Sequence, residues 1–266
     1  MAEDAGGHPG APPIGFRGVV FDLFHTLADP ERFRPPDFHR ALFTATFFGL
    51  DPTAVRQAWE AGADGRVTDR AFTLERTVRE LLREAGRPEP TSLKLERYDR
   101  EVGRYQDEAL LRPDEPTLRA LAGLRSADRR LGLLSNVEER DTRAWERSPL
   151  RPFFDAVSFS VDLGAAKPAP EAYLAVLAGL GLAPRECVYV GDGGSDELAG
   201  ARRVGFGLVV FMRGHVSHGF RSPAVCRLFE DTADVTVDDL GEMVPLTLGG
   251  SLGRHSRDRR RRPGAP

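Results

Sequence analysis

Six short apolar segments recur along the chain between helical patterns, and this alternation constrains the fold more than any other feature. Most of these segments are apolar on both faces, which is typical of strands in a parallel sheet that is covered on both sides. Strand, helix and strand repeated in this way predict a doubly wound α/β layer. The predicted strands are "GVVFD" (18–22), "LGLLS" (131–135), "AVSFS" (156–160), "CVYVG" (187–191), "GLVVF" (207–211) and "ADVTV" (233–237).

Helical patterns fill the intervals between the later strands. They cover residues 115–124, 170–181 and 195–205, and the second of them closes on Gly181. Glycine is the usual residue at a left-handed cap after a helix. The predicted fold class is therefore α/β, with a doubly wound and mostly parallel sheet.

Residues 30–112 interrupt this rhythm, because they contain no convincing strand and several helical starts and stops. Asp51, followed by proline, is a predicted N-cap that opens one helix. A later helical pattern ends on Gly86. We therefore predict an all-helical cap over residues 30–112, inserted into an α/β core that comprises residues 14–29 and 113–245.

Both ends of the chain differ in composition from the rest. Residues 1–13 are rich in Gly, Ala and Pro, and we predict that they and the basic tail, residues 249–266, are disordered. The segment 254–262 carries six arginines and one aspartate, which leaves a formal charge of −8 on the remaining chain. An acidic body argues against a nucleic-acid groove in the folded part. The tail is a candidate for contact with polyanions, although such short basic runs are more often solvated ends.

The start of the chain lacks the basic patch and the apolar stretch of a signal peptide, and no apolar run is long enough to span a bilayer. We therefore expect a cytoplasmic protein without membrane contact. Cys187 and Cys226 match no paired metal spacing, and no disulfide is expected. Both are interpreted as packing or surface residues. Nothing in the sequence predicts an oligomeric state.

Polar side chains follow three of the predicted strands. Asp22 follows "VVF", Ser135 follows "LGLL" and Asp192 follows "VYVG". In an open α/β sheet, ligands bind outside the carboxyl ends of the parallel strands. We therefore expect these three side chains to converge at one edge of the sheet, although each of them taken singly is also consistent with a simple helix cap.

The glycine-rich stretch "GDGGSDE" places Asp192 and Asp196 close together on a turn where the backbone can approach a ligand. Two acids near Asp22 would repel one another without a cation between them, and carboxylate oxygens suit Mg²⁺. A dinucleotide-binding loop is disfavoured, since the stretch fails the G-x-G-x-x-G pattern at its last position. Beside such acids, Lys167 in "GAAKPAPEAY" is a candidate for balancing charge and for holding an anionic substrate.

Four motifs, which follow one another in the order typical of the family, make the chain resemble the haloacid dehalogenase (HAD) superfamily. Most members of this superfamily are Mg²⁺-dependent phosphatases. The resemblance extends from about residue 16 to residue 243, and it implies a Rossmann-like core with an inserted helical cap. Each motif alone is weak, whereas four in order are specific. The motifs are "VVFDLFHTL", "LGLLSN", "AAKPAPEAY" and "YVGDGGSDELAGARRVG".

The resemblance implies a role for each catalytic residue. Asp22 is then the nucleophile that takes the phosphoryl group as an aspartyl-phosphate, and Thr26 holds that carboxylate. Ser135 and Asn136 bind the oxygens of the transferring group. Lys167 neutralises charge on the nucleophile and the substrate. These are the groups that phosphoryl transfer requires, because it depends on placing atoms in line and stabilising charge.

The resemblance also implies a magnesium site. Asp22, the backbone carbonyl of Phe24 and Asp192 are its expected ligands. Asp196 is expected either to bind the ion itself or to contact the residues that bind it.

Phe24 departs from the pattern, because phosphatases of this superfamily usually carry a second aspartate there. That aspartate protonates the leaving oxygen and later activates water, and losing such a group typically costs on the order of 10² to 10⁴ in rate. A phosphatase with Phe24 therefore needs a good leaving group, or proton transfer by His25 or by a residue of the cap.

Two other hypotheses follow from Phe24. In a 2-haloacid dehalogenase, Asp22 displaces a halide that needs no proton, and dehalogenases resemble this chain in having an aromatic residue at this position. Arg32 or Arg34 is then a candidate for holding the halide or carboxylate. A third hypothesis is a catalytically impaired module that keeps the fold for binding, which predicts erosion of the other motifs, and none is visible.

The fourth motif favours the phosphatase, because dehalogenases work without metal and do not need the arrangement of Asp192 and Asp196. We therefore predict a Mg²⁺-dependent hydrolase that acts on a small phosphorylated metabolite. A helical cap suits sugar phosphates, phosphoglycolate-like acids or nucleotides better than a protein substrate.

Overall fold

The computed structural model of the chain describes residues 15–214 and 222–248. The two segments predicted to be disordered, residues 1–13 and 249–266, lie outside the described residues. Within the described part, no helix combines the length and the apolar character that crossing a membrane requires.

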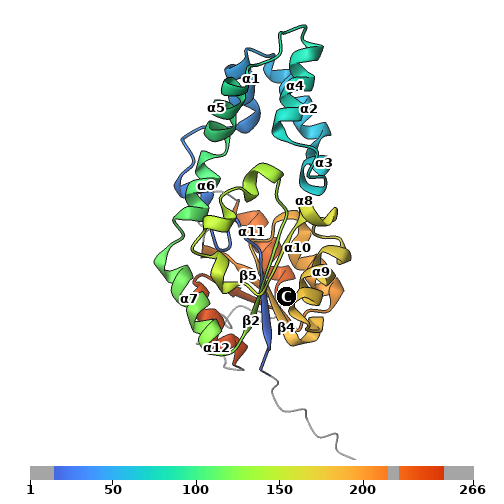
Figure 1. Cartoon of the computed structure of the whole chain (residues 1–266). Helices are drawn as coiled ribbons and strands as arrows, with labels where there is room; N and C mark the ends of the chain where they lie inside the picture. Colours follow the sequence, from blue (N-terminus) through green and yellow to red (C-terminus); the bar gives the residue numbers. More distant parts are fainter. Residues whose placement is uncertain (1–14, 215–221, 249–266) are drawn as a thin grey trace, which may run out of the picture.

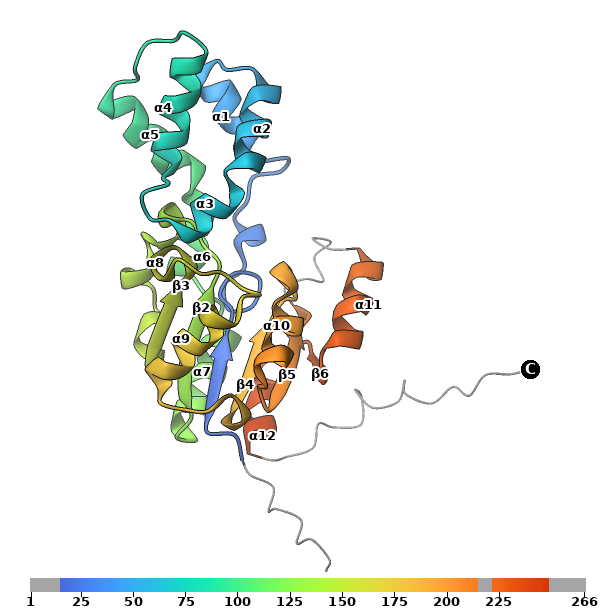
Figure 2. The same cartoon turned by 90° about the vertical axis from the view of Figure 1, so that its right-hand side faces the viewer.

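Six parallel strands form one sheet in the order β3-β2-β1-β4-β5-β6, and each corresponds to a strand predicted from the sequence. The α/β class with a parallel sheet is therefore confirmed. Because β1 lies inside the sheet, it pairs with both β2 and β4, and Phe21 lies opposite Leu133 and Val190. Figure 2 shows the strands side by side. They are β1 (Gly18–Phe21), β2 (Arg130–Ser135), β3 (Ala156–Phe159), β4 (Cys187–Gly191), β5 (Leu208–Met212) and β6 (Val235–Val237).

Helices cover both faces of the sheet, with α7 and α12 on one side and α9 and α10 on the other (Figure 1). Successive strand residues alternate between the faces, so that Val19 and Phe21 enter one hydrophobic cluster and Val20 enters the other. Gly181 caps α9 with φ 61°, as predicted. The helices of this part are α7 (Glu115–Ser126), α8 (Ser160–Leu163), α9 (Pro170–Leu180), α10 (Glu197–Val204), α11 (Pro223–Thr232) and α12 (Met243–Thr247), with short 3-10 helices η2 (Glu139–Thr142), η3 (Trp145–Arg147), η4 (Arg151–Phe153), η5 (Pro184–Glu186), η6 (Gly194–Asp196) and η8 (Leu240–Glu242).

The segment predicted as a helical cap contains only helices and turns. Asp51 caps its helix as predicted, because its side chain accepts a hydrogen bond from the backbone N–H of Ala54 at 2.8 Å. Val78 and Tyr98 lie in a hydrophobic cluster separate from those of the sheet. A separate cap domain stays a prediction. The helices are η1 (Pro30–Arg32), α1 (Arg40–Phe48), α2 (Pro52–Ala61), α3 (Ala63–Thr68), α4 (Leu74–Glu84), α5 (Ser92–Val102) and α6 (Arg104–Leu111).

These helices stand beyond the carboxyl ends of the strands, on the side where the chain leaves β1 (Figures 1 and 2). The last turn of α6 returns to the sheet, since Ala109 and Leu110 are buried in the same cluster as Leu27. The arrangement places a helical layer over the edge of the sheet where the predicted site residues are expected.

Candidate active site

Three neighbouring strands bring the predicted site residues to one edge of the sheet. Asp22 follows the inner strand β1, and its backbone N–H donates to the carbonyl of Val190 in β4 at 2.9 Å. Ser135 ends β2 on one side of β1, and Asp192 follows β4 on the other. All three residues are buried. The structure therefore brings together the strand-end residues that the sequence led us to expect there.

Both carboxylate oxygens of Asp22 are held. Thr26 donates its hydroxyl to Oδ2 at 3.2 Å, and Lys167 donates its ammonium group to Oδ1 at 2.5 Å. Thr26 lies in the tight turn after β1. In this turn the backbone N–H of Leu27 donates to the carbonyl of Leu23 at 2.8 Å. The carboxylate of Asp22 thus has a defined orientation.

Glu197 is a site residue that the sequence reasoning missed. Its Oε2 accepts hydrogen bonds from Lys167 at 2.5 Å and from the hydroxyl of Tyr189 at 2.7 Å. Its Oε1 accepts from the backbone N–H of Gly193 at 2.9 Å. The side chain is buried and connects the first turn of α10 to β4 and to the Lys167 loop.

Asp196 does not lie beside Lys167 and the other carboxylates, as Glu197 does. The reason is that two successive residues before α10 adopt left-handed backbone angles. Ser195 has φ 53° and Asp196 has φ 50°, so the helix starts at Glu197, two residues later than predicted. Asp196 is exposed and lies outside the group of clustered carboxylates. A Cβ on Gly191 would lie only 2.1 Å from Oε1 of Glu197, so that glycine makes room for the carboxylate.

The buried carboxylates of Asp22, Asp192 and Glu197 each offer an oxygen, and these oxygens lie within 4.8 Å of one another. Carboxylate oxygens are the donors that Mg²⁺ prefers. The residues therefore fit a divalent cation, although Lys167 already donates to two of the three carboxylates.

Burial shifts the protonation of this group. It raises the pKa of Asp22, an effect that the positive charge of Lys167 opposes and the negative charge of Asp192 reinforces. Burial also raises the pKa of Glu197 to about 8, again against the charge of Lys167. Burial alone would lower the pKa of Lys167, but Asp22 and Glu197 outweigh it and hold that pKa above its ordinary value. Added positive charge would favour the ionised carboxylates.

Asn136 is engaged differently from the expectation. Its side-chain amide donates to the carbonyl of Lys167 at 2.9 Å, and its side-chain oxygen accepts from the Lys167 backbone N–H at 2.8 Å. The amide therefore fixes the loop that carries the lysine. Ser135, the preceding residue, is buried at the end of β2.

Phe24 and His25 lie in the turn after Asp22. The side chain of Phe24 is half-buried and packs against the hydrophobic cluster under α7. His25 has φ 64°, and its Nε2 lies 4.0 Å from Oε1 of Glu31. Burial lowers the pKa of His25, which favours the neutral imidazole at pH 7. Glu31 also pairs with Arg34 at 3.0 Å, so this arginine is already engaged by a carboxylate.

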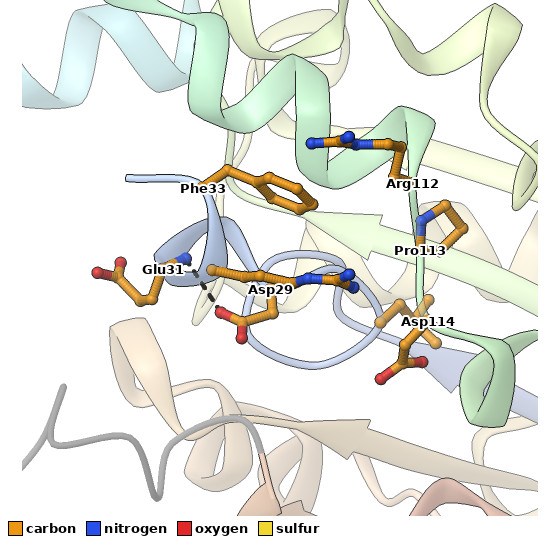
Figure 3. Close-up of a pocket in the computed structure, with 8 residues that line it drawn as sticks. Asp29, Glu31, Phe33, Arg112, Pro113 and Asp114 are labelled. Atoms are coloured by element: carbon orange, nitrogen blue, oxygen red, sulfur yellow. Dashed lines mark hydrogen bonds between the residues drawn. The ribbon is translucent and has the colours of Figure 1, made fainter. Parts of the chain in front are cut away.

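A pocket of about 540 Å³ lies where the chain leaves and re-enters the sheet region. In Figure 3, Phe33 and Arg112 lie on one side of it, and Asp29 and Asp114 lie on the other. None of the predicted catalytic residues lines this pocket, whereas Arg32 does. Its lining residues are Leu27, Asp29, Glu31, Arg32, Phe33, Arg112, Pro113 and Asp114.

Two sequence signals could have identified Glu197. A tyrosine in the fully buried strand "CVYVG" needs a hydrogen-bond partner, so Tyr189 indicates a buried acceptor nearby. Glycines on both sides of Asp192 also permit a turn in which the acid that faces the strands is shifted by one residue. The register of α10 itself depends on the tertiary structure.

Comparisons with known proteins agree with these features. The sequence profile of the haloacid dehalogenase-like hydrolase family matches residues 16–205. The chain is 30% identical over 143 residues to the glyceraldehyde 3-phosphate phosphatase of Methanocaldococcus jannaschii. This alignment covers 52% of this chain and 58% of that phosphatase, so the chain spans less than two thirds of the length of this relative. It is 26% identical over 248 residues to the phosphoglycolate phosphatase of Salmonella typhimurium, which covers 86% of this chain and 91% of that enzyme.

Solved structures share the fold. The 2-haloacid dehalogenase of Pseudomonas syringae pv. Tomato matches with a TM-score of 0.60 and 20% identity, covering 88% of this chain and 98% of that one. At this level of identity the likeness concerns the fold alone.

Proposed function

The chain belongs to the haloacid dehalogenase-like hydrolases and is an enzyme of that family, and we propose that it is a Mg²⁺-dependent phosphomonoesterase. The substrate is a small phosphorylated metabolite, and Asp22 forms the aspartyl-phosphate. The similarity to a phosphoglycolate phosphatase, which extends over 86% of the chain, supports a phosphorylated substrate.

One observation carries the proposal, namely the buried group of Asp22, Asp192 and Glu197 beside Lys167. Displacing a halide needs the nucleophile but no second and third carboxylate. A cluster of acids around one ammonium group is suited to binding a cation together with a phosphoryl group, since phosphoryl transfer concentrates negative charge.

In the first proposed step, an oxygen of Asp22 attacks phosphorus, and the bond from phosphorus to the leaving oxygen breaks. Water then hydrolyses the aspartyl-phosphate, releasing phosphate and restoring the carboxylate. Thr26 and Lys167 hold the two oxygens of Asp22, which orients the nucleophile before the substrate arrives. Ser135 is proposed to bind the phosphoryl oxygens, and Asn136 to position the Lys167 loop.

Asp22, Asp192 and the carbonyl of Phe24 are the proposed metal ligands, and Glu197 takes the supporting position first expected of Asp196. When bound, Mg²⁺ supplies positive charge that draws the phosphoryl oxygens toward the site and offsets charge in the transition state.

Phe24 restricts the leaving group. Its side chain packs against the hydrophobic cluster and cannot transfer a proton. The enzyme is therefore expected to favour esters whose alcohol leaves without strong protonation, or to take the proton from a residue of the helices above the sheet. His25 is disfavoured as the acid, because burial keeps its imidazole neutral at pH 7.

A 2-haloacid dehalogenase is the second candidate, and Phe24 is the observation that favours it. In this reaction Asp22 attacks carbon and displaces halide, and no proton is needed by the leaving group. Both candidates use the same nucleophile, so a variant of Asp22 does not separate them.

The experiment that separates them is incubation of the purified full-length protein with 4-nitrophenyl phosphate and, separately, with 2-chloropropionate. Each substrate is tested with Mg²⁺ and with EDTA. We expect Mg²⁺-dependent release of phosphate, followed by a screen that includes glyceraldehyde 3-phosphate and phosphoglycolate. Chloride release that persists in EDTA would reject the phosphatase in favour of the dehalogenase.

A further inference from the structure

Glu138, in the loop after β2, bridges two of the helices that stand over the sheet. Its Oε2 accepts a hydrogen bond from Arg40 at 3.0 Å, and its Oε1 accepts from Arg66 at 2.9 Å. Arg40 is the first residue of α1, and Arg66 belongs to α3. Glu138 itself lies three residues after Ser135. A single carboxylate thus joins both helices to the loop that begins at the candidate active site.

Asp141 completes the cluster from the same loop. Its Oδ1 accepts from Arg40 at 2.5 Å, and its Oδ2 accepts from the backbone N–H of Glu138 at 3.4 Å. The four side chains carry no net charge, and their exposed fractions are only 13% for Arg40, 4% for Arg66, 13% for Glu138 and 11% for Asp141. The cluster is therefore largely shielded from water and internally neutral.

The other side of this loop is tied to the sheet region. Asn136 makes both of its side-chain hydrogen bonds to the backbone of Lys167, as described above. The backbone N–H of Val137 donates to Oγ of Ser160 at 3.0 Å. A displacement of α1 or α3 that keeps the pairs to Glu138 would therefore pull on residues that adjoin Ser135.

A third arginine, Arg140, strengthens the same connection. Arg140 donates to both carboxylate oxygens of Asp107 at 2.8 and 2.6 Å, and to the carbonyl of Asp99 at 2.9 Å. A Cβ on Gly103 would lie 2.3 Å from Cζ of Arg140, so this glycine makes room for the guanidinium. The loop after β2 thus contacts α5 and α6 as well as α1 and α3.

Burial makes the Glu138 cluster act as a unit. A buried charge that loses its partner without reaching water is strongly unfavourable. If only some of the ion pairs separated, Arg40 or Glu138 would be left as a charge without a partner and without water. If all of them separated, water would reach every charged group. Separating only some of these pairs is therefore unfavourable compared with the paired arrangement seen here.

We propose that Glu138 is a positioning residue that couples the placement of α1 and α3 to the loop of Ser135 and Asn136. The helices close over Asp22 when substrate is bound, and the cluster of Glu138, Asp141, Arg40 and Arg66 holds the closed arrangement during the reaction. This proposal rests on the phosphoryl transfer proposed above. Closure excludes bulk water while the aspartyl-phosphate forms and retains the bound substrate.

The test is Glu138→Gln in the full-length protein, because glutamine keeps the shape but accepts from only one arginine. With 4-nitrophenyl phosphate and Mg²⁺, KM is expected to rise at least about tenfold, the factor for losing one hydrogen bond to a charged group. The change in kcat is expected to be smaller, since closure mainly traps the substrate. Hydrogen exchange is expected to accelerate in α1 and α3 and to stay unchanged in β1 and β4.

Asp162→Asn is the matched control. The ion pair of Arg70 and Asp162 also joins the helical segment to the sheet region, but both side chains are about half exposed. Exposed pairs contribute little to stability. KM and hydrogen exchange in this variant are therefore expected to match the unmodified protein.

The outcomes separate the role of Glu138 from the proposed function. If hydrogen exchange in α1 and α3 is the same in Glu138→Gln as in the unmodified protein, the coupling is overturned, whatever the activity of the variant. A loss of kcat with unchanged KM, or faster exchange throughout the sheet, shows a structural role and also overturns it. An unmodified protein that releases no phosphate rejects the proposed function, a result that is independent of the exchange measurement on Glu138.

Discussion

The ammonium group of Lys167 donates to Oδ1 of Asp22 at 2.5 Å, across 145 residues of sequence. The lysine comes from the loop before α9 and the aspartate from the end of β1. The pair is buried, so the lysine offsets charge on the carboxylate where water does so only weakly. This contact connects the first motif to the third and sets the nucleophile in place.

Asp22→Asn is expected to abolish turnover, with a loss of at least about 10⁴ in kcat, because the amide cannot act as the nucleophile. Asparagine keeps the size of the side chain, and its single oxygen can still accept from either Lys167 or Thr26. The far-ultraviolet circular dichroism spectrum is therefore expected to stay unchanged. Full activity in this variant would reject Asp22 as the nucleophile.

Glu197→Gln and Asp196→Asn are expected to differ sharply, although the two acids are adjacent. Loss of the buried Glu197 charge removes a partner of Lys167, and we expect at least about tenfold weaker Mg²⁺ activation. Asp196 is exposed, and its variant is expected to stay within about twofold of the unmodified enzyme. Mg²⁺ titrations of the initial rate measure both, and the reverse order would contradict the arrangement described here.

Phe24→Asp is expected to raise phosphatase activity or to broaden the range of leaving groups, by at most the 10² to 10⁴ that a general acid typically supplies. The cost is expected in stability, at about 1–3 kcal/mol, because a carboxylate replaces a ring that packs against the core cluster. Rates for aryl phosphates of different leaving-group pKa, with thermal melts, measure the two effects. An unchanged profile would indicate that the proton comes from elsewhere.

The stability of the metal-free protein is expected to fall as pH rises from about 5 to 8. Burial raises the pKa of Glu197 from 4.5 to about 8, so in this window the folded state binds a proton that the unfolded state has lost. Each such proton changes the free energy of unfolding by up to about 1.4 kcal/mol per pH unit. Urea unfolding in EDTA measures the slope, which should be smaller for Glu197→Gln.

Cys187 is expected to resist thiol reagents in the folded protein. Both cysteines are free, and burial raises the pKa of Cys187 to about 12. The reactive thiolate is therefore scarce at pH 8. Titration with 5,5′-dithiobis(2-nitrobenzoate) is expected to detect Cys187 only after unfolding, and fast modification of Cys187 in the native state would contradict its burial.

Local signals predicted the elements because they depend on short segments. Each apolar run is short and bounded by turns, and its residues must be buried on both faces, so all six strands were predicted. Asp51 and Gly181 cap helices through hydrogen bonds and backbone angles that are set within a few residues. The position of Asp22 follows in the same way, since it ends an inner strand.

Other features depended on contacts between distant segments. Asn136 was expected at the phosphoryl group, but its amide binds the backbone of Lys167, which is 31 residues away. No local pattern specifies that pairing. Glu138 lies beside the second motif without belonging to it, and its two arginines come from the helical insertion.

The sequence by itself determined the parallel α/β sheet, the helical character of residues 30–112 and the strand ends that hold Asp22, Ser135 and Asp192. These features follow from hydrophobic periodicity and from the position of each polar residue directly after an apolar run. Only the tertiary structure decided that Glu197, and not Asp196, joins the carboxylates. That choice depends on left-handed backbone angles at Ser195 and Asp196 and on the space left by Gly191, and such packing is set by segments that meet only after the chain has folded.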